Sequence, residues 1–466
     1  MPETSQQFSI VDAPGKRWLL GHVLEFKRSP LATMTRWRER CGDFVRFSLG
    51  PKDLHLLSHP VLAEEVLVKQ ADVFAKVYDP NRPTGLALVL GNGLLTSGGE
   101  LWRRQRRLIQ PMFQRARVAR MSIQMVEAAE QMLARWAQRR PGEPCDVAAE
   151  MMQLALEVVT RTMFSTSLLK DVGSLGPSLL VLIRYAFRSF HNPVRLPLWV
   201  PTASNREFLR AKQLVDRMIY GLIEERRRSG ARRDDLLDAL LWTVDPETGK
   251  GLSEQQQRDE LLTIAAAGHE TTANALTWTW YLLAGNPTAA FRLREELADV
   301  LGGRAPTIDD LPRLSYTRAV FEEALRLYPP APAVQRRATR DTAVGGQPLP
   351  AGSIVLVSLW NIHRHPAFWE QPEQFDPDRF AGHRADSDHH AAFLPFGSGP
   401  RTCIGNHFAM VEGVLLLALI AQRYELYLVP DARVEMELAV TLRPRYGLPM
   451  ILRPRDRRSP STAHRD

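Results

Sequence analysis

A single cysteine stands in a loop-forming stretch near the end of the chain, residues 396–405, together with three glycines and a proline. This composition is incompatible with a helix interior or a regular strand, so it predicts a shaped loop that presents Cys403. The apolar pattern that follows predicts a helix beginning just after the cysteine. A helix N-terminus lowers the pKa of a nearby thiol and favours the thiolate, which is the form that binds a metal. Phe396 can shield the sulfur from water, and Arg401 places a positive charge two residues before it.

An acid and two hydroxyls interrupt a run of small residues at 265–273, in the middle of a long helical pattern. Ser253 and Gln256 have the spacing of a capping box, and a glycine and a proline mark the other end. The sequence therefore predicts a helix of about 32 residues and roughly 48 Å. Small side chains let a bulky group approach the backbone, and a threonine can bond a preceding carbonyl and bend the helix. Glu270 and Thr271 are candidates for proton transfer.

The pair His269-Glu270 could open the zinc-protease motif H-E-x-x-H. The position of the second histidine is Ala273, so the motif is incomplete and we exclude a zinc protease. We expect His269 to pack or to face solvent rather than to bind a metal.

Both stretches resemble signature motifs of the cytochrome P450 family, F-x-x-G-x-R-x-C-x-G for the cysteine loop and A-G-x-[DE]-T-[TS] for the helix. The resemblance implies that Cys403 is the axial iron ligand of haem b (iron protoporphyrin IX) and that Arg401 meets a haem propionate. It also implies that Thr271 hydrogen-bonds the bound oxygen and that Glu270 relays protons from solvent. The other positions expected to line the cofactor are Phe396, Gly405, Ala267 and Gly268, with Gly268 leaving space for the ligand.

A helix predicted from Leu101 carries the family's W-x-x-x-R pattern at Trp102 and Arg106. The resemblance places both residues beside a haem propionate, and it assigns Arg336 to the same role. The remaining arginines of this helix are expected to face solvent on the side of the cysteine loop, where they could dock an acidic electron donor.

The E-x-x-R pair of Glu323 and Arg326 resembles another family motif, and Arg379 lies in a segment resembling P-x-R-F. These three residues are expected to form a buried charge network that supports folding and haem retention rather than chemistry. Positions that the resemblance places in the substrate pocket are Ala266, Val334 and Leu442, next to Thr441.

These patterns predict a mainly α protein with small β-sheets, and the resemblance implies the cytochrome P450 fold, with the long central helix over the haem and the cysteine loop beneath it. Short strands are expected in a hairpin at 44–57, at 354–358 and near the C-terminus. Residues 78–99 and 183–205 are predicted as loops, which the family places over the distal pocket and the substrate channel.

The predicted division of the chain is a flexible N-terminus (1–14), a single catalytic domain (15–454) and a disordered tail (455–466). Residues 226–235 are expected to form a solvated turn between helices.

Composition restricts the functional class further. The 466 residues carry a net charge of +8 without a recognisable nucleic-acid module, so the excess suits an acidic protein partner. The 3 cysteines argue for a reducing compartment and against a disulfide framework. Without a signal peptide or a membrane-spanning run, the sequence predicts a cytoplasmic, bacterial-type enzyme that acts as a monomer.

The resemblance implies a haem-thiolate monooxygenase that inserts one atom of O2 into a lipophilic substrate such as a fatty acid, a terpene or a polyketide-like molecule. Hydroxylation and epoxidation are both open. Electrons are expected from a separate ferredoxin and ferredoxin reductase, because only about 60 residues follow Cys403. Two alternatives stay open: a P450 that uses or isomerises peroxides, and a non-catalytic haem-thiolate sensor. Glu270 and Thr271 argue against the first.

Overall fold

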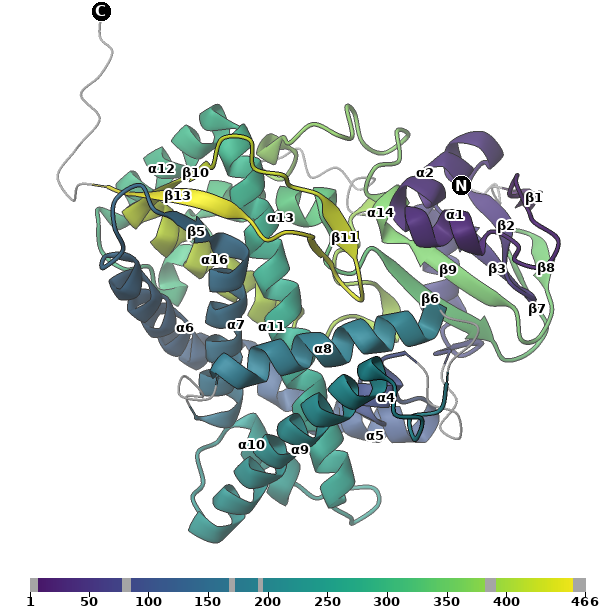
Figure 1. Cartoon of the computed structure of the whole chain (residues 1–466), viewed down its shortest axis with the longest axis horizontal. Helices are drawn as coiled ribbons and strands as arrows, with labels where there is room; N and C mark the ends of the chain where they lie inside the picture. The colour runs from purple at the N-terminus through teal and green to yellow at the C-terminus, as the bar shows by residue number, and fades with distance from the viewer. Residues whose placement is uncertain (1–6, 78–84, 167–171, 192–195, 382–390, 456–466) are drawn as a thin grey trace, which may run out of the picture.

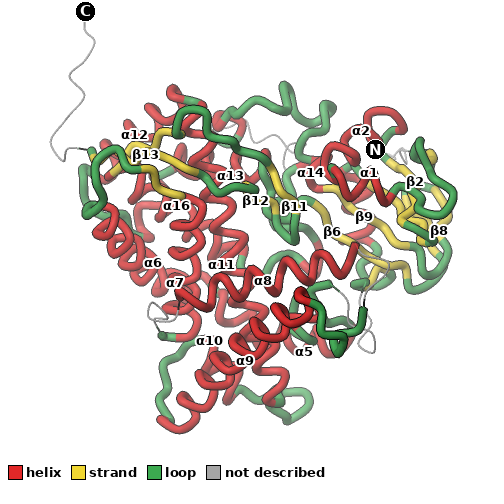
Figure 2. The backbone as a smooth tube through the Cα atoms, in the orientation of Figure 1, coloured by secondary structure: helices red, strands yellow, loops and turns green. Residues whose placement is uncertain are grey.

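The computed structural model describes residues 7–77, 85–166, 172–191, 196–381 and 391–455. Its helices gather around α11 (Glu254–Gly285), while many of the strands lie together at one side with the N-terminal helices (Figures 1 and 2). The mainly α fold with small sheets is confirmed. The other long helices are α2 (Pro30–Cys41), α5 (Gly99–Ile109), α6 (Arg115–Trp136), α7 (Val147–Phe164), α8 (Val172–His191), α9 (Ala203–Ser229), α12 (Pro287–Leu301), α13 (Ser315–Leu327) and α16 (Asn406–Arg423). The short helices are α1 (Val23–Arg28), α3 (Pro60–Glu64), α4 (Ala87–Leu90), α10 (Leu236–Trp242) and α14 (Leu359–Ile362).

The central helix α11 has the predicted ends. Ser253 and Gln256 form a capping box, in which the side chain of each accepts the backbone N–H of the other. Most of α11 is buried, because α7 lies along it and both α13 and α16 contact it. Since a helix enclosed on several sides cannot shift easily, α11 is a firm support for the acid and hydroxyls at its middle.

The strands form one larger sheet and three small ones. The sheet of six strands has the order β1 (Val11–Asp12), β2 (Phe44–Leu49), β3 (Lys52–Leu57), β9 (Ile354–Ser358), β6 (Ala333–Ala338) and β4 (Phe74–Ala75). A second sheet joins β10 (Tyr424–Leu428), β13 (Pro449–Pro454) and β5 (Pro144–Asp146), and two-stranded pairs join β7 (Thr342–Val344) to β8 (Gln347–Leu349) and β11 (Met436–Leu438) to β12 (Leu442–Pro444). The predicted hairpin, the strand at 354–358 and the C-terminal strands are thereby confirmed.

Two predicted connections are more ordered than expected. Helix α8 continues to His191 and α9 begins at Ala203, so the predicted loop over 183–205 is wrong at both ends. Apolar side chains such as Leu182 and Ala186 are buried along one helical face, which explains why this apolar stretch is helical. Arg226, expected in a solvated turn, is buried and pairs with Asp235 at 2.8 Å, so it ties the end of α9 to the start of α10.

The described part of the N-terminal segment is anchored, since Phe8 is buried and β1 pairs with β2. Residues 78–84 of the predicted distal loop and the tail from 456 lie outside the described residues. Among the helices that are described, none is long and apolar enough to cross a membrane.

Candidate functional site

The cysteine loop depends on backbone conformations that favour glycine. Gly397 and Gly399 have φ angles of 70° and 73°, and a Cβ on Gly399 would lie 1.8 Å from the carbonyl oxygen of Leu67. The loop closes where the N–H of Cys403 donates to the carbonyl oxygen of Phe396 at 3.0 Å, and α16 begins shortly afterwards. The predicted loop and helix are both present, with the cysteine between them.

Cys403 keeps an accessible side chain, whereas Cys145 is buried. Desolvation by the surrounding loop raises the pKa of the Cys403 thiol, and this outweighs the opposing effects of the Gly405 N–H and the Arg106 charge. The Gly405 N–H thus acts in the direction expected for a helix N-terminus, but desolvation is the larger effect on the free thiol. A cation at the sulfur would reverse the balance, since a coordinating thiol is deprotonated.

Four cationic side chains form a cluster beside this loop: Lys76, Arg106, Arg336 and Arg401. Arg336 on β6 is 6% exposed, and burial lowers its pKa to about 10. Burial, and then the charges of Arg336 and Arg106, lower the pKa of Arg401 to about 10. Lys76, which the sequence analysis missed, has its pKa lowered to about 7 by burial and then by Arg336 and Arg401.

Within the described part of the chain, none of these four cations forms a salt bridge with a carboxylate. Desolvated positive charges that repel one another are costly unless an anion joins them. Arg side chains also match carboxylates in a planar, bidentate geometry. The cationic cluster therefore fits a negatively charged ligand.

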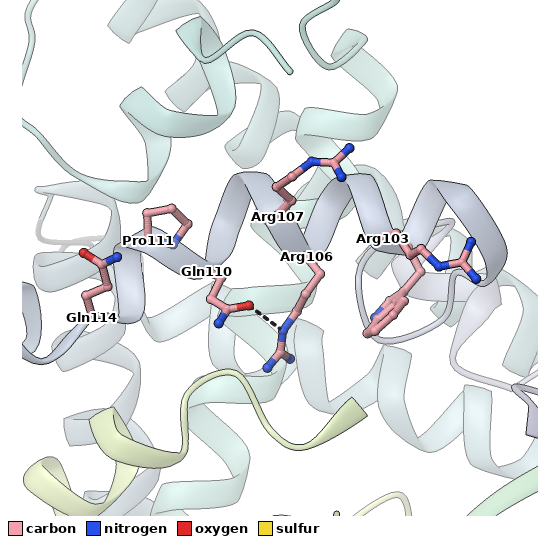
Figure 3. Close-up of a pocket in the computed structure, with 7 residues that line it drawn as sticks. Arg103, Arg106, Arg107, Gln110, Pro111 and Gln114 are labelled. Atoms are coloured by element: carbon pink, nitrogen blue, oxygen red, sulfur yellow. Dashed lines mark hydrogen bonds between the residues drawn. The ribbon is translucent and has the colours of Figure 1, made fainter. Parts of the chain in front are cut away.

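Helix α5 directs its side chains to different sides, as Figure 3 shows. Arg106 points toward the cysteine loop, where its Nη1 donates to the carbonyl oxygen of Thr402 at 2.9 Å, and its Nε contacts Gln110 Oε1 at 3.4 Å. The ring of Trp102 lies 4.3 Å from the guanidinium of Arg401. The predicted pair of Trp102 and Arg106 thus supports the cysteine loop and its arginine directly.

The other arginines of α5 are less free than expected. Arg104 and Arg107 pair with the buried carboxylate of Asp245 at 3.4 and 3.2 Å, so the expectation that they face solvent is wrong for Arg104 and only partly correct for Arg107. Arg103 is mainly exposed and pairs with Glu100. A shallow surface pocket of about 440 Å³ lies along this helix, lined by Trp102, Arg103, Arg106, Arg107, Gln110, Pro111 and Gln114 (Figure 3).

The middle of α11 shows two local features of the small-residue run. The hydroxyl of Thr271 donates to the carbonyl oxygen of Ala267 at 2.7 Å, as expected for a threonine that perturbs the helix. A Cβ on Gly268 would lie 2.9 Å from Val159 Cγ2 on α7. A side chain at residue 268 would point at α7. The expectation that Gly268 leaves space for a ligand is therefore wrong, because the glycine instead lets α7 pack closely against α11.

His269 is buried, and its Nδ1 lies 3.1 Å from the carbonyl oxygen of Ala265. Burial lowers the pKa of this histidine, which favours the neutral ring. It is a packing residue, as the sequence indicated.

Glu270 does not face bulk solvent, since it is 3% exposed and its Oε1 accepts a hydrogen bond from Thr441 Oγ1 at 2.7 Å. A second buried acid, Glu412 of α16, lies next to Thr272. Burial raises the pKa of Glu412 to about 8, and the nearby Thr272 opposes this rise. The sequence analysis missed Glu412, although an acid inside the otherwise apolar pattern of α16 was an available signal.

The expected charge network of Glu323, Arg326 and Arg379 is present. Arg326 binds Glu323 through two hydrogen bonds of 2.6 and 2.8 Å, and both side chains are fully buried. Arg379 Nε lies 3.4 Å from Glu323 Oε1. Arg326 also donates to three backbone carbonyls, those of His363, Pro372 and Gln374, so the network fixes the segment that leads to the cysteine loop.

The three expected pocket residues differ in their surroundings. Leu442 is 0% exposed and belongs to a core cluster with Trp37, so its assignment to a pocket wall is wrong. Val334 is partly buried against another core cluster and Ala266 is buried on α11. Their contact with substrate stays a prediction.

Comparisons with known proteins agree with this geometry. The family description that matches the chain is Cytochrome P450, over residues 12–449. Cyclooctatin synthase of Streptomyces melanosporofaciens is 41% identical over 429 residues, 91% of each chain. Cyclooctat-9-en-7-ol 5-monooxygenase of the same organism is 37% identical over 90% of each chain. Pentalenene oxygenase of Streptomyces avermitilis is 35% identical over 93% of this chain and 95% of the relative.

Proposed function

This chain belongs to the cytochrome P450 family and is a haem-dependent monooxygenase, and we propose that it oxygenates a cyclic terpene. The relatives carry the argument for the substrate. One is named for oxygenation of pentalenene, a hydrocarbon, and another for oxygenation at position 5 of cyclooctat-9-en-7-ol, which already carries a hydroxyl. A cyclic terpene hydrocarbon or its mono-alcohol is therefore the substrate class, and hydroxylation is the reaction.

The haem would be held from two sides by residues of this chain. Cys403 would supply the sulfur ligand, because it is the most exposed of the three cysteines and lies between a glycine-shaped loop and a helix N-terminus. The cationic cluster would hold the two propionates, because negative groups would compensate its unpaired positive charges. When bound, the haem iron activates O2 with electrons from the redox partner.

We assign proton transfer to the residues at the middle of α11. Thr271 holds its hydroxyl on the Ala267 carbonyl, and its oxygen keeps a free lone pair that can accept a hydrogen bond. Glu270 is the neighbouring acid and supplies protons in the same region. Because Glu270 is buried, protons must reach it from solvent through other groups rather than directly.

The redox partner is an acidic ferredoxin that docks beside the cysteine loop. Arg103 is exposed on α5, and Arg115 and Arg318 are exposed near His407, where their charges help to lower the histidine's pKa; Arg318 also pairs with Glu322 at 2.9 Å. A positive surface next to the cofactor attracts an acidic donor and shortens the electron path. Arg115→Glu and Arg318→Glu should weaken donor-dependent reduction, most strongly at low salt. Arg210→Glu on α9 is the matched control.

The substrate proposal is tested by a binding screen followed by product analysis. Cyclic terpene hydrocarbons, terpene mono-alcohols and linear fatty acids are added to the haem-loaded protein, and the spin-state change of its absorption spectrum is recorded. Compounds that bind are turned over with isotopically labelled O2. We expect a cyclic terpene to bind and to gain one labelled oxygen. Binding and oxidation of fatty acids alone would refute the terpene assignment while leaving the family unchanged.

A further inference from the structure

The turn between β11 and β12 is attached to the middle of α11 by polar contacts. Thr441 Oγ1 donates to Glu270 Oε1 at 2.7 Å and accepts from Asn274 Nδ2 at 3.0 Å. Trp278 Nε1 donates to the carbonyl oxygen of Leu442 at 3.0 Å. Glu270, Asn274 and Trp278 are spaced four residues apart, so they lie on one face of the helix. Three hydrogen-bonding side chains on one face of α11 thus hold the turn between β11 and β12.

The backbone on both sides of Thr441 is fixed. The side chain of Leu442 is 0% exposed, and its N–H donates to the carbonyl oxygen of Pro330 at 3.0 Å. The N–H of Ala439 donates to the carbonyl oxygen of Thr441 at 3.1 Å, which closes the turn. The hydroxyl is therefore delivered to Glu270 by a rigid scaffold and not by a loose loop.

Asn274 gives the hydroxyl its direction. A threonine hydroxyl has one hydrogen to donate, and its oxygen can accept. Since Asn274 donates to that oxygen, the hydrogen is left for the carboxylate of Glu270. The amide, the hydroxyl and the carboxylate form one directed chain of donors and acceptors.

The hydrogen bonds of the Glu270 carboxylate are shielded from water. Glu270, Thr441 and Asn274 are 3%, 5% and 2% exposed, so water competes little for these bonds. A hydrogen bond to a buried charged group is worth more than one between neutral groups.

We infer that Thr441 is a positioning residue for Glu270: its hydroxyl holds the carboxylate in the orientation from which protons are delivered. This rests on the proposed role of Glu270 as the proton-donating acid. Two electrons and two protons convert O2 to H2O2, whereas four of each convert it to two molecules of water. Poorer proton delivery therefore increases the share of O2 that leaves as H2O2.

The test measures that share in the haem-loaded protein with a surrogate ferredoxin, its reductase and NADPH, and it needs no organic substrate. Thr441→Val keeps the shape and removes the hydroxyl, and we expect the ratio of H2O2 to water to rise about tenfold, the scale of losing one hydrogen bond to a charged group. Thr441→Ser should restore the ratio. Asn274→Ala, which leaves the turn sequence intact, should raise it by less.

Thr279→Val is the matched control. Thr279 is a buried threonine of α11, the helix that carries Glu270, but its hydroxyl donates to the Ala275 carbonyl oxygen at 2.7 Å. Its ratio should stay that of the unmodified protein.

Glu270→Gln separates the inference from the role on which it rests. If Glu270→Gln leaves the ratio unchanged, the proton-donating role itself is refuted. If Glu270→Gln raises the ratio but Thr441→Val does not, or if both changes add in the double variant, Thr441 does not act through Glu270. An equal rise in the Thr279→Val control would also overturn the inference.

Discussion

Replacement of Gly268 by alanine tests why the centre of α11 is built from small residues. In an open helix, glycine to alanine stabilises by about 1 kcal/mol, because alanine has the better helix propensity. Here the new Cβ would lie 2.9 Å from Val159 Cγ2, a side chain that is 1% exposed. Valine has a restricted χ1 in a helix, so it cannot turn away easily, and overpacking of this kind costs about 1 to 3 kcal/mol. We expect Gly268→Ala to destabilise the protein by about 1 kcal/mol.

The sign should reverse when Val159 is shortened. Val159→Ala alone loses buried apolar atoms and costs about 2 kcal/mol, but it removes the obstacle to the new methyl group. In that background Gly268→Ala should stabilise, which gives a coupling energy of about 2 kcal/mol. Urea unfolding of the four haem-loaded proteins measures this cycle. Stabilisation by Gly268→Ala with Val159 intact, or a haem spectrum that changes regardless of residue 159, would refute helix packing as the reason for the glycine.

Three further predictions follow from buried charges. Arg336→Gln should weaken haem binding by about tenfold, because it removes one buried cation that we expect to meet the propionates. Arg340→Gln, in the exposed pair with Asp72, is the control and should leave haem binding unchanged. Titration of the apoprotein with haem measures both affinities. The native pKa of Glu412, about 8, lies above its ordinary value of 4.5, so the native protein binds more protons between these values and its stability should fall as pH rises through them. Glu412→Gln should reduce that fall, while the buried Glu260, whose pKa is also raised to about 8, keeps its own share; an unchanged pH dependence of the unfolding midpoint would contradict the assignment to Glu412. Arg326→Gln should cost about 3 to 5 kcal/mol because it leaves the Glu323 carboxylate buried without its bidentate partner, while Arg318→Gln on the exposed face of α13 should change stability by less than about 0.5 kcal/mol.

The sequence predicted those features that depend on local chemistry. Ser253 and Gln256 identify the start of α11 because a capping box needs only four consecutive residues. The cysteine loop was recognisable because glycines with positive φ are needed at 397 and 399. The charge network at Glu323 was predicted from two residues on one helical turn and a third that the resemblance supplied.

The sequence did not predict the contacts that tertiary packing creates. Lys76 joins the cationic cluster from a segment far from Arg401 in the chain, and no local pattern distinguishes it from a surface lysine. Asp245, in a loop distant in sequence, forms a salt bridge with Arg104, and the charges along α5 do not predict this pairing. A small residue such as Gly268 reveals close approach but not which neighbour approaches, and only the structure identifies Val159.

The central claim is that the sulfur of Cys403 binds the haem iron. The direct measurement is the absorption spectrum of the reduced protein with carbon monoxide, compared between the unmodified chain and Cys403→His. We predict a thiolate-type spectrum for the unmodified protein and a histidine-type spectrum, or loss of haem, for the variant. A histidine-type spectrum from the unmodified protein, or a thiolate-type spectrum that persists in Cys403→His, would contradict the assignment.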